Sequence, residues 1–510
     1  MRIRFASLTS CAVALPLLVG GCTTQVSTNP PEPVPAPAPE PEPEPEPEPV
    51  AEATKEYPAP PAAGTPKPVN FPPIADFQLD NGLMVYLVEN HEVPLVSVQL
   101  VVRAGSMDDA IVADLTATML GEGTKARSKA KIDEAIEYVG GSLGQGAGTH
   151  ATYVSARTLK KDLKLGLTLL ADQVVNPLFP AEALEKQKAQ VKASLSMAAS
   201  EPGSLASQLF GNLAYPDGHP YGRMMPTPEQ VDAVTVDDLK TFHETFFRAN
   251  NSFVVIAGDI TPEEAKPLIE RTLGKWKYTS GRKLPANPLN AHKSYTLPSE
   301  LVVHVVDRPG SAQAEILLGN LSLARNHKDW AALSVANSLL GGSASGRLFQ
   351  DIREEKGLAY NVSSSLSDGQ APGTFYISTR TRTNTTGEML AGLFGHLKTM
   401  RTEAPSADEV SAATARIVGQ FPLELETPNQ IAAKVREGLI YALPSDYWKD
   451  YRDVIGAVTP EQVLDAAKKY MHPIPHVVIV GEAKEIQSQV SAVLPKATVK
   501  VYGADLKPKG

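Results

Sequence analysis

The chain carries the same order of sequence features twice, and this repeat constrains its fold more than any other property. In the first copy, Val234-Thr235 precedes a helical pattern that leads to an apolar run at 253–258. In the second copy, Val458-Thr459 leads in the same way to the apolar run 477–481. The period of about 223 residues is far longer than the unit of a solenoid. The sequence therefore predicts two homologous α+β domains in a row.

Local patterns predict strands followed by helices within each copy. Strand-type alternation surrounds Asp80-Asn81-Gly82, a tripeptide typical of a tight hairpin turn. Further along the first copy, apolar residues at helical spacing predict helices at 131–139, 160–175, 181–199 and 236–247. In the second copy, apolar runs predict strands at 302–306 and 316–318 and a helix at 330–340. The order of elements is therefore shared by the two copies.

Prolines divide the chain into segments. Nearly half of the 43 prolines lie before Ile74, in a stretch of mainly Pro, Glu and Ala that cannot bury a core and favours an extended, disordered spacer. A second group of prolines, at 285, 288 and 298, marks a linker between the copies. The predicted segments are a signal peptide (1–21), a lipid-attachment cysteine with a Pro/Glu-rich linker (22–73), an N-terminal domain (74–280), a linker (281–298) and a C-terminal domain (299–510).

The first residues predict export. Arg2 and Arg4 precede an apolar stretch that is too short to span a bilayer comfortably. This stretch ends in Leu-Val-Gly-Gly-Cys, which resembles a bacterial lipobox and implies a lipid on Cys22. Thr23, where inner-membrane lipoproteins carry Asp, favours the outer membrane, with the protein on its periplasmic side. The alternative is a plain secretory signal with an incidental cysteine.

Charge and cysteine content exclude several classes of protein. The formal net charge of −9 argues against a nucleic-acid-binding protein. Two cysteines are too few for a disulfide-stapled scaffold or a Cys-based zinc module.

Six short motifs resemble those of one enzyme family. They are Leu-Asp-Asn-Gly-Leu at 79–83, Arg-Ala-Gly-Ser at 103–106, Gly-Glu-Gly-Thr at 121–124, Leu-Gly-Gly-Ser at 340–343, Arg-Leu-Phe at 347–349 and Lys-Gly-Leu-Ala-Tyr at 356–360. In this order they resemble the insulinase/pitrilysin-type zinc metallopeptidases, in the branch of the mitochondrial processing peptidase. The resemblance implies two α/β sandwich domains, each with a mixed sheet covered on one face by helices.

Active members of that family carry H-x-x-E-H on a helix, where two histidines one turn apart share a zinc ion and the glutamate acts as general base. By the resemblance, the corresponding residues here are Asp114, Ala117 and Thr118, and the stretch that supplies the third ligand, 191–195, contains no acid. His472 and His476 have the right spacing, but Pro473 and Pro475 lie between them and disfavour a helix. His219 resembles a family residue with a role in a turn. We therefore expect no metal or other cofactor in this chain.

The second copy retains residues that the family uses on substrate. Arg353 and Tyr360 match an Arg/Tyr pair that faces the zinc across the cleft. A phenol can donate a hydrogen bond to an oxyanion, and a guanidinium can hold a carbonyl or carboxylate. The alternative is a surface arginine and a packing tyrosine. The loop with Gly341, Gly342, Ser343 and Gly346 resembles a substrate-guiding loop, and a simple helix-to-helix turn is the alternative.

These features together predict a subunit that is inactive alone. In the processing-peptidase branch, one subunit holds H-x-x-E-H and zinc, and a second subunit supplies the Arg/Tyr pair. The sequence predicts the second type: a periplasmic, membrane-attached, non-catalytic subunit whose partners are the zinc-bearing subunit and unfolded peptides. The alternative function is that of a proteolytically inactive scaffold or peptide-binding protein.

Overall fold

A computed structural model of the chain describes residues 69–276 and 283–509. The predicted signal peptide, Cys22 and nearly all of the Pro/Glu-rich linker lie outside these described residues. Within the two described ranges, no helix combines the length and the hydrophobicity needed to cross a bilayer.

The first half contains a six-stranded mixed sheet with the strand order β1-β2-β6-β3-β5-β4. β2 and β6 are parallel, and the other neighbouring strands are antiparallel. The predicted hairpin turn joins β1 to β2: the N–H of Gly82 donates to the carbonyl of Leu79 at 2.9 Å, and Gly82 has a φ of +86°, which favours glycine. The strands are β1 (Ala75–Gln78), β2 (Met84–Glu89), β3 (Leu95–Val102), β4 (Ser142–Ala147), β5 (Thr152–Leu159) and β6 (Ser252–Gly258).

The second half repeats this sheet, with the strand order β12-β7-β11-β8-β10-β9. Its strands are β7 (Val302–Asp307), β8 (Gln313–Leu321), β9 (Ala359–Leu366), β10 (Thr374–Arg382), β11 (His476–Gly481) and β12 (Thr498–Tyr502). As β2 lies parallel to β6, so β7 lies parallel to β11. The two sheets differ at their outer strand, because β1 pairs with β2 through a hairpin, whereas β12 comes from the C-terminal end and lies parallel to β7. The repeated mixed-sheet architecture confirms the predicted fold class.

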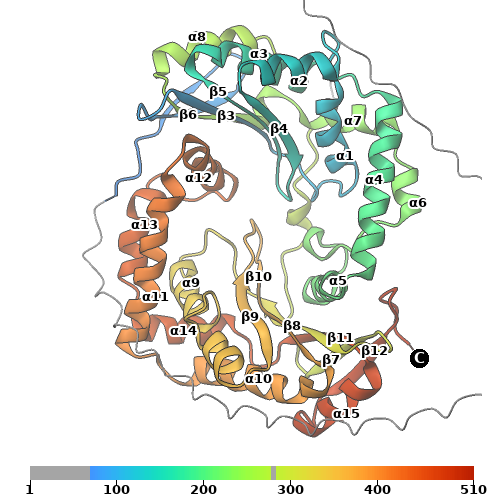
Figure 1. The fold of residues 1–510 in the computed structure, drawn as a ribbon. Coiled ribbons are helices and arrows are strands. Elements are labelled where there is room, and N and C mark those ends of the chain that lie inside the picture. The colour runs from blue at the N-terminus through green and yellow to red at the C-terminus, as the bar shows by residue number, and fades with distance from the viewer. Residues whose placement is uncertain (1–68, 277–282, 510) are drawn as a thin grey trace, which may run out of the picture. The chain divides into compact units, whose positions relative to one another are not determined.

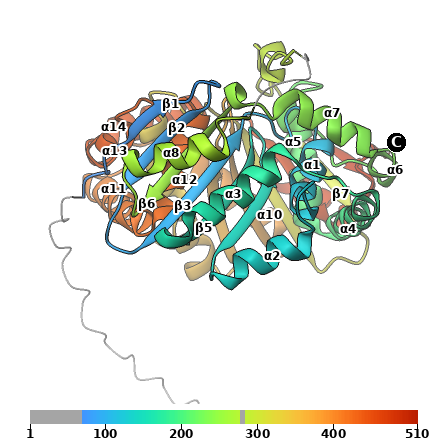
Figure 2. The same cartoon turned by 90° about the horizontal axis from the view of Figure 1, so that it is seen from above.

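Helices cover one face of each sheet, as Figures 1 and 2 show for α3 and α8 over the first sheet. In the first half these helices include α1 (Val112–Met119), α2 (Lys129–Tyr138), α3 (Leu163–Val175), α4 (Ala181–Ser200), α7 (Val236–Phe246) and α8 (Pro262–Thr272), and the short α6 (Pro228–Asp232) packs on α4. In the second half they include α9 (Trp330–Leu340), α10 (Thr386–Thr402), α11 (Ala407–Gln420), α13 (Tyr447–Gly456), α14 (Pro460–Tyr470) and α15 (Ala483–Val493). A separate apolar core lies between helices and sheet in each half.

The repeated Val-Thr dipeptide has a local structural reason. Thr235 is the N-cap of α7 and Thr459 is the N-cap of α14. In each case the threonine hydroxyl accepts the N–H three residues on, and the side chain of that residue bonds back to the N-cap backbone. This capping box satisfies N–H groups that a helix leaves without partners in its first turn. The dipeptide therefore marks where corresponding helices start.

Two helices each pack on the sheet of the opposite half. α5 (Pro202–Ala214) belongs to the first half in sequence but packs on β8 and β11, and α12 (Pro428–Ile440) packs on β3 and β6. Figure 1 shows α12 on the face of the first sheet that lies away from α3 and α8. Leu205 and Leu209 of α5 join one buried cluster with Val480 of β11. Each half thus contributes a helix to the core of the other.

Polar contacts fix α12 against the first sheet. The amide oxygen of Asn429 accepts hydrogen bonds from Gln99 Nε2 at 3.0 Å and from Ser97 Oγ at 3.2 Å. Arg436 Nη1 donates to the amide oxygen of Gln99 at 2.8 Å. Because Ser97 and Gln99 are buried strand residues, their pairing with α12 satisfies polar groups that would otherwise destabilise the core.

Candidate functional site

By the resemblance noted in the sequence, the helix expected to correspond to the family's zinc-binding helix is α1 (Val112–Met119). The side chain of Asp109 accepts the N–H groups of Ile111 and Val112 at 3.0 and 2.9 Å, just where the helix begins. On α1, Asp114 is exposed, Ala117 is buried and Thr118 is half-buried. Although Asp114 as a residue is exposed, partial desolvation of its carboxyl group raises its pKa.

These residues do not fit a zinc ion. Asp114 and Thr118 lie one turn apart, but only Asp114 is a good ligand, and the methyl group of Ala117 cannot accept a proton. α4 packs against α1, and its stretch 191–195 contains no acid. In the described part of the chain, no three His, Cys, Asp or Glu side chains gather in a way that could hold a metal.

The structure brings Arg353 and Tyr360 together. The segment Phe349–Glu355 (η6) is a π-helix, a wide helical turn that often occurs at functional sites. It is followed by Gly357, whose φ of +60° reverses the chain into the edge strand β9. The guanidinium carbon of Arg353 lies 5.1 Å from the ring centroid of Tyr360 and 4.6 Å from that of Phe349. Tyr360 itself is 87% exposed, so its hydroxyl is accessible.

An open cavity of about 550 Å³ lies beside Tyr360. Its walls include Glu315 of β8 and Arg380 of β10, which form an ion pair at 2.7 Å. Arg380 also pairs at 3.0 Å with Glu201, which lies between α4 and α5. The site around Tyr360 therefore has polar walls, and the first half of the chain contacts one of its charged residues.

The glycine-rich loop between α9 and η6 is tightly packed. The N–H of Gly342 donates to the carbonyl of Asn337 at 2.8 Å, and the carbonyl of Gly341 accepts from Ser364 of β9 at 3.0 Å. A side chain on Gly341 would come within 2.8 Å of the Leu348 side chain and of the Ser364 backbone. Gly346 is buried, while Ser343 is only half-buried and bonds to Ser345. Close packing thus accounts for Gly341 and Gly346 without a substrate.

The remaining candidate histidines have structural surroundings. His219 accepts the N–H of Tyr221 at 3.1 Å in a tight turn, and its ring stacks on that of Tyr215. Burial lowers the pKa of His219 to about 4. His472 and His476 do not share a helix, because His472 bonds within its own turn at Ile474 and His476 begins β11.

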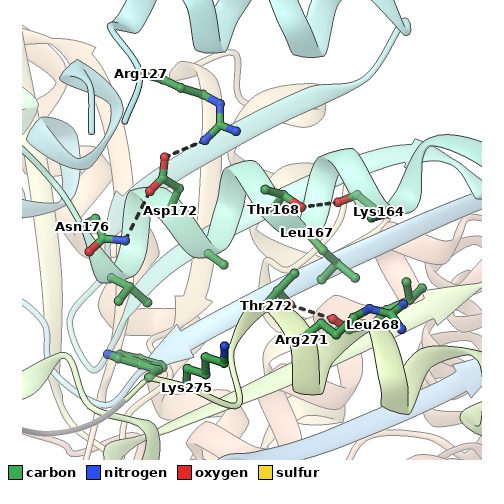
Figure 3. Close-up of a pocket in the computed structure, with 13 residues that line it drawn as sticks. Arg127, Lys164, Leu167, Thr168, Asp172, Asn176, Leu268, Arg271, Thr272 and Lys275 are labelled. Carbon is green, nitrogen blue, oxygen red and sulfur yellow. Dashed lines mark hydrogen bonds and ion pairs between the residues drawn. The ribbon is translucent and has the colours of Figure 1, made fainter. Parts of the chain in front are cut away.

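A basic pocket that the sequence did not indicate lies between α3 and α8 (Figure 3). Lys164, Arg271 and Lys275 line this space of about 400 Å³. Arg127 also lines it, and its charge is balanced by Asp172 at 2.9 Å. These cations are scattered over about 150 positions of the sequence, so no local pattern could have revealed them.

The described residues form two mixed-sheet α/β halves, and α1 offers only one good metal ligand, Asp114. Two models of one family match successive parts of the chain: "Insulinase (Peptidase family M16)" over residues 84–220 and "Peptidase M16 inactive domain" over residues 233–417. Together they account for well over half of the sequence. The chain belongs to peptidase family M16.

The chain is similar to proteins whose names give only a class of enzyme. An "uncharacterized zinc protease" of Streptomyces coelicolor is 25% identical over 372 residues, which is 72% of this chain and 80% of that protein. A protein of the same description from Bacillus subtilis is 25% identical over 363 residues, or 70% of this chain and 85% of its own length.

Solved structures share the fold. A peptidase M16 inactive domain from Pseudomonas fluorescens superimposes with a TM-score of 0.74 at 27% identity, covering 80% of this chain and 98% of that one. A protease from Helicobacter pylori gives a TM-score of 0.72 at 19% identity, covering 81% of this chain and 100% of that one, a likeness of fold alone.

Proposed function

We propose that this chain is the non-catalytic subunit of a heterodimeric zinc endopeptidase. A partner of the same family would carry H-x-x-E-H and its zinc, and this chain would contribute Arg353 and Tyr360 to the shared site. The observation that carries the proposal is the contrast between α1, whose residues do not fit zinc, and the accessible Arg353–Tyr360 pair beside a cavity.

The two side chains would have different tasks. Tyr360 would donate a hydrogen bond from its hydroxyl to the oxyanion that develops on the scissile carbonyl, and Arg353 would hold a carbonyl or carboxylate of the peptide. A zinc ion held by the partner would supply the activated water. Because β9 is an edge strand, its outer backbone groups are also suited to pairing with an extended peptide. This arrangement supports unfolded peptides as the substrate class.

The first test concerns activity and metal content. The purified chain alone should contain no stoichiometric zinc and should cleave no peptide, and co-purification from the native membrane should recover a family member with H-x-x-E-H. Stoichiometric zinc together with chelator-sensitive hydrolysis by the isolated chain would contradict the proposal.

The second test separates an active subunit from a scaffold. In the complex, Tyr360→Phe keeps the ring and removes only the hydroxyl, so assembly should survive while turnover falls roughly 10²-fold. Tyr138→Phe on α2 is a matched control, because Tyr138 is equally exposed and lies outside the cavity. Arg353→Ala should also raise KM, since it removes a multi-donor contact to the peptide. If gel filtration shows intact complexes and both variants cleave at wild-type rates, the scaffold function replaces the one proposed here.

We also propose that the protein is a lipoprotein on the periplasmic side of the outer membrane, attached through Cys22. The support is the sequence of residues 1–23. Cys22→Ala should leave the precursor unprocessed or release the protein from the membrane fraction, because acyl chains supply the attachment. Unchanged processing and unchanged membrane partition would refute the attachment.

A further inference from the structure

The basic pocket between α3 and α8 is built from one face of each helix. On α3, its lining residues recur at helical spacing, as in Lys164, Leu167, Ala171 and Val175. On α8 and the turn after it, the same spacing joins Leu268, Arg271 and Lys275. The two faces border a shared space of about 400 Å³, within the size range of small-molecule sites (Figure 3).

Three of the four cations that line this pocket have no charge partner. Among the described residues, the side chains of Lys164, Arg271 and Lys275 form no ion pair and no hydrogen bond. The fourth cation, Arg127, pairs at 2.9 Å with Asp172, the one carboxylate of the lining. Four cations and one carboxylate give the lining a net charge of +3, although the whole chain carries −9. An anion in the pocket would therefore be attracted by a local charge opposite to that of the chain.

Asp172 is held by its own donors and does not neutralise the other cations. Its side chain is only 11% exposed, and besides Arg127 it accepts hydrogen bonds from Thr124 Oγ1 at 2.6 Å and from Asn176 Nδ2 at 3.3 Å. These three donors fix the carboxylate at one end of α3. The charges of Lys164, Arg271 and Lys275 are thus left for a ligand.

Helix electrostatics does not account for Lys164. It is the second residue of α3, where the helix dipole favours anions and disfavours a cation. Arg271, in the last turn of α8, is by contrast where the dipole favours a cation. An anion between the two helices would offset the unfavourable position of Lys164.

Much of the remaining wall is apolar. Leu167, Ala171 and Trp276 are buried, and Val175 and Leu268 are half-buried. An apolar wall gains free energy when it is covered by an apolar group, and a small hydrated ion does not cover it. Unpaired cations beside an apolar wall therefore match a ligand with an anionic head and an apolar body.

We propose that this pocket binds a phosphate monoester that carries an apolar group. Such a phosphate has close to two negative charges at neutral pH and three acceptor oxygens, whereas a single carboxylate would leave most of the +3 charge uncompensated. Arg271 and Lys275, one turn apart, donate to the phosphate oxygens, and Lys164 donates from the facing helix. The apolar group packs on Trp276.

Two sources of ligand share this chemistry, a soluble phosphorylated metabolite and the headgroup of a phosphatidic acid. The residues that line the cavity beside Tyr360 do not line this pocket. The proposal therefore stands or fails separately from the function proposed above.

Isothermal titration calorimetry of the full chain at pH 8 tests the ligand class. Phenyl phosphate and monomeric dihexanoyl phosphatidic acid represent the two sources, and the one that binds more tightly identifies the source. Benzenesulfonate keeps a ring but has a single charge, and inorganic phosphate keeps the dianion but has no apolar group. Both should bind at least about 10-fold more weakly than the better monoester. No saturable binding of either monoester at millimolar concentration, or equal binding of benzenesulfonate or inorganic phosphate, would overturn the proposal.

Three variants test the assigned contacts. Lys164→Gln, Arg271→Gln and Lys275→Gln should each weaken binding about 3- to 10-fold, because each removes a charge-assisted hydrogen bond. All three residues are exposed, so folding should survive the substitutions. Lys131→Gln on α2, an exposed lysine outside the pocket, loses the same charge and should bind as wild type does. If the three variants bind like this control, the pocket is not the site.

A measurement on the wild-type chain locates the ligand without changing a cation. The chain has three tryptophans, and Trp276 is the one that lines the pocket. With ¹⁵N-labelled tryptophan, the indole N–H resonance of Trp276 is identified by its absence from the spectrum of Trp276→Phe. It should shift along the calorimetric binding curve, because the apolar group of the ligand packs on this ring. A Trp276 resonance that does not move at saturation refutes the assignment.

Discussion

Replacing Ile431 by Ala tests whether α12 holds the two halves together. Ile431 is 2% exposed and lies on α12 in a buried cluster with Phe253 and Val255 of β6. The change removes about three buried methyl or methylene groups at ~0.8 kcal/mol each, and the remaining cavity adds to this loss. We expect the free energy of unfolding to fall by about 3–4 kcal/mol.

Urea denaturation followed by circular dichroism measures this effect. The midpoint should fall, and the two halves should begin to unfold in separate steps, because α12 belongs to one half and packs on the sheet of the other. Leu423→Ala is the control, since Leu423 is 57% exposed and should cost no more than about 0.5 kcal/mol. If Ile431→Ala costs no more than this control, the buried face of α12 does not stabilise the chain as argued.

Two further predictions concern backbone geometry and pH. Gly258 has a φ of +137°, and a side chain there would meet the carbonyl oxygen of Leu95. Gly258→Ala should therefore lower the free energy of unfolding, measured by urea denaturation, by about 3 kcal/mol or more. The control Gly456→Ala, with open space around it, should leave that free energy unchanged or raise it by up to about 1 kcal/mol, and equal effects of the two variants would contradict this account. Burial lowers the pKa of His304 to about 4 from an ordinary value of 6.5, so the unfolded chain binds more protons between these values and stability should fall on acidification from pH 6.5 to 4. His304→Asn should reduce that pH dependence in denaturation experiments at several pH values, and an unchanged slope would show that His304 does not contribute.

Much of the fold could be predicted because local chemistry determines it. The turn at Asp80-Asn81-Gly82 and the capping threonines Thr235 and Thr459 act within a few residues, so their patterns are visible in the sequence. The assignment of α5 and α12 to opposite sheets could not be predicted, because an apolar stripe such as Leu205 and Leu209 shows that a helix is buried but not which sheet covers it.

The candidate site likewise has a part that could be predicted from the sequence and a part that could not. The proximity of Arg353 and Tyr360 follows from seven residues of sequence, a π-helical turn and one glycine. The surroundings of His150, by contrast, depend on Tyr221 and Tyr441, which are distant in sequence and meet it only in the folded chain. Nothing in the local pattern around His150 indicates that its ring is buried.

The exchange of α5 and α12 has a consequence for the order in which the protein can be made. The first sheet is complete in sequence at β6, yet α12, which covers its second face, follows only at residues 428–440. A ribosome releases the chain from its N-terminus, so the apolar side chains of β3 and β6 on that face emerge well before their cover. Until then they can bind other nascent chains instead. A chaperone that shields this face, or export before folding, would protect the chain during that interval.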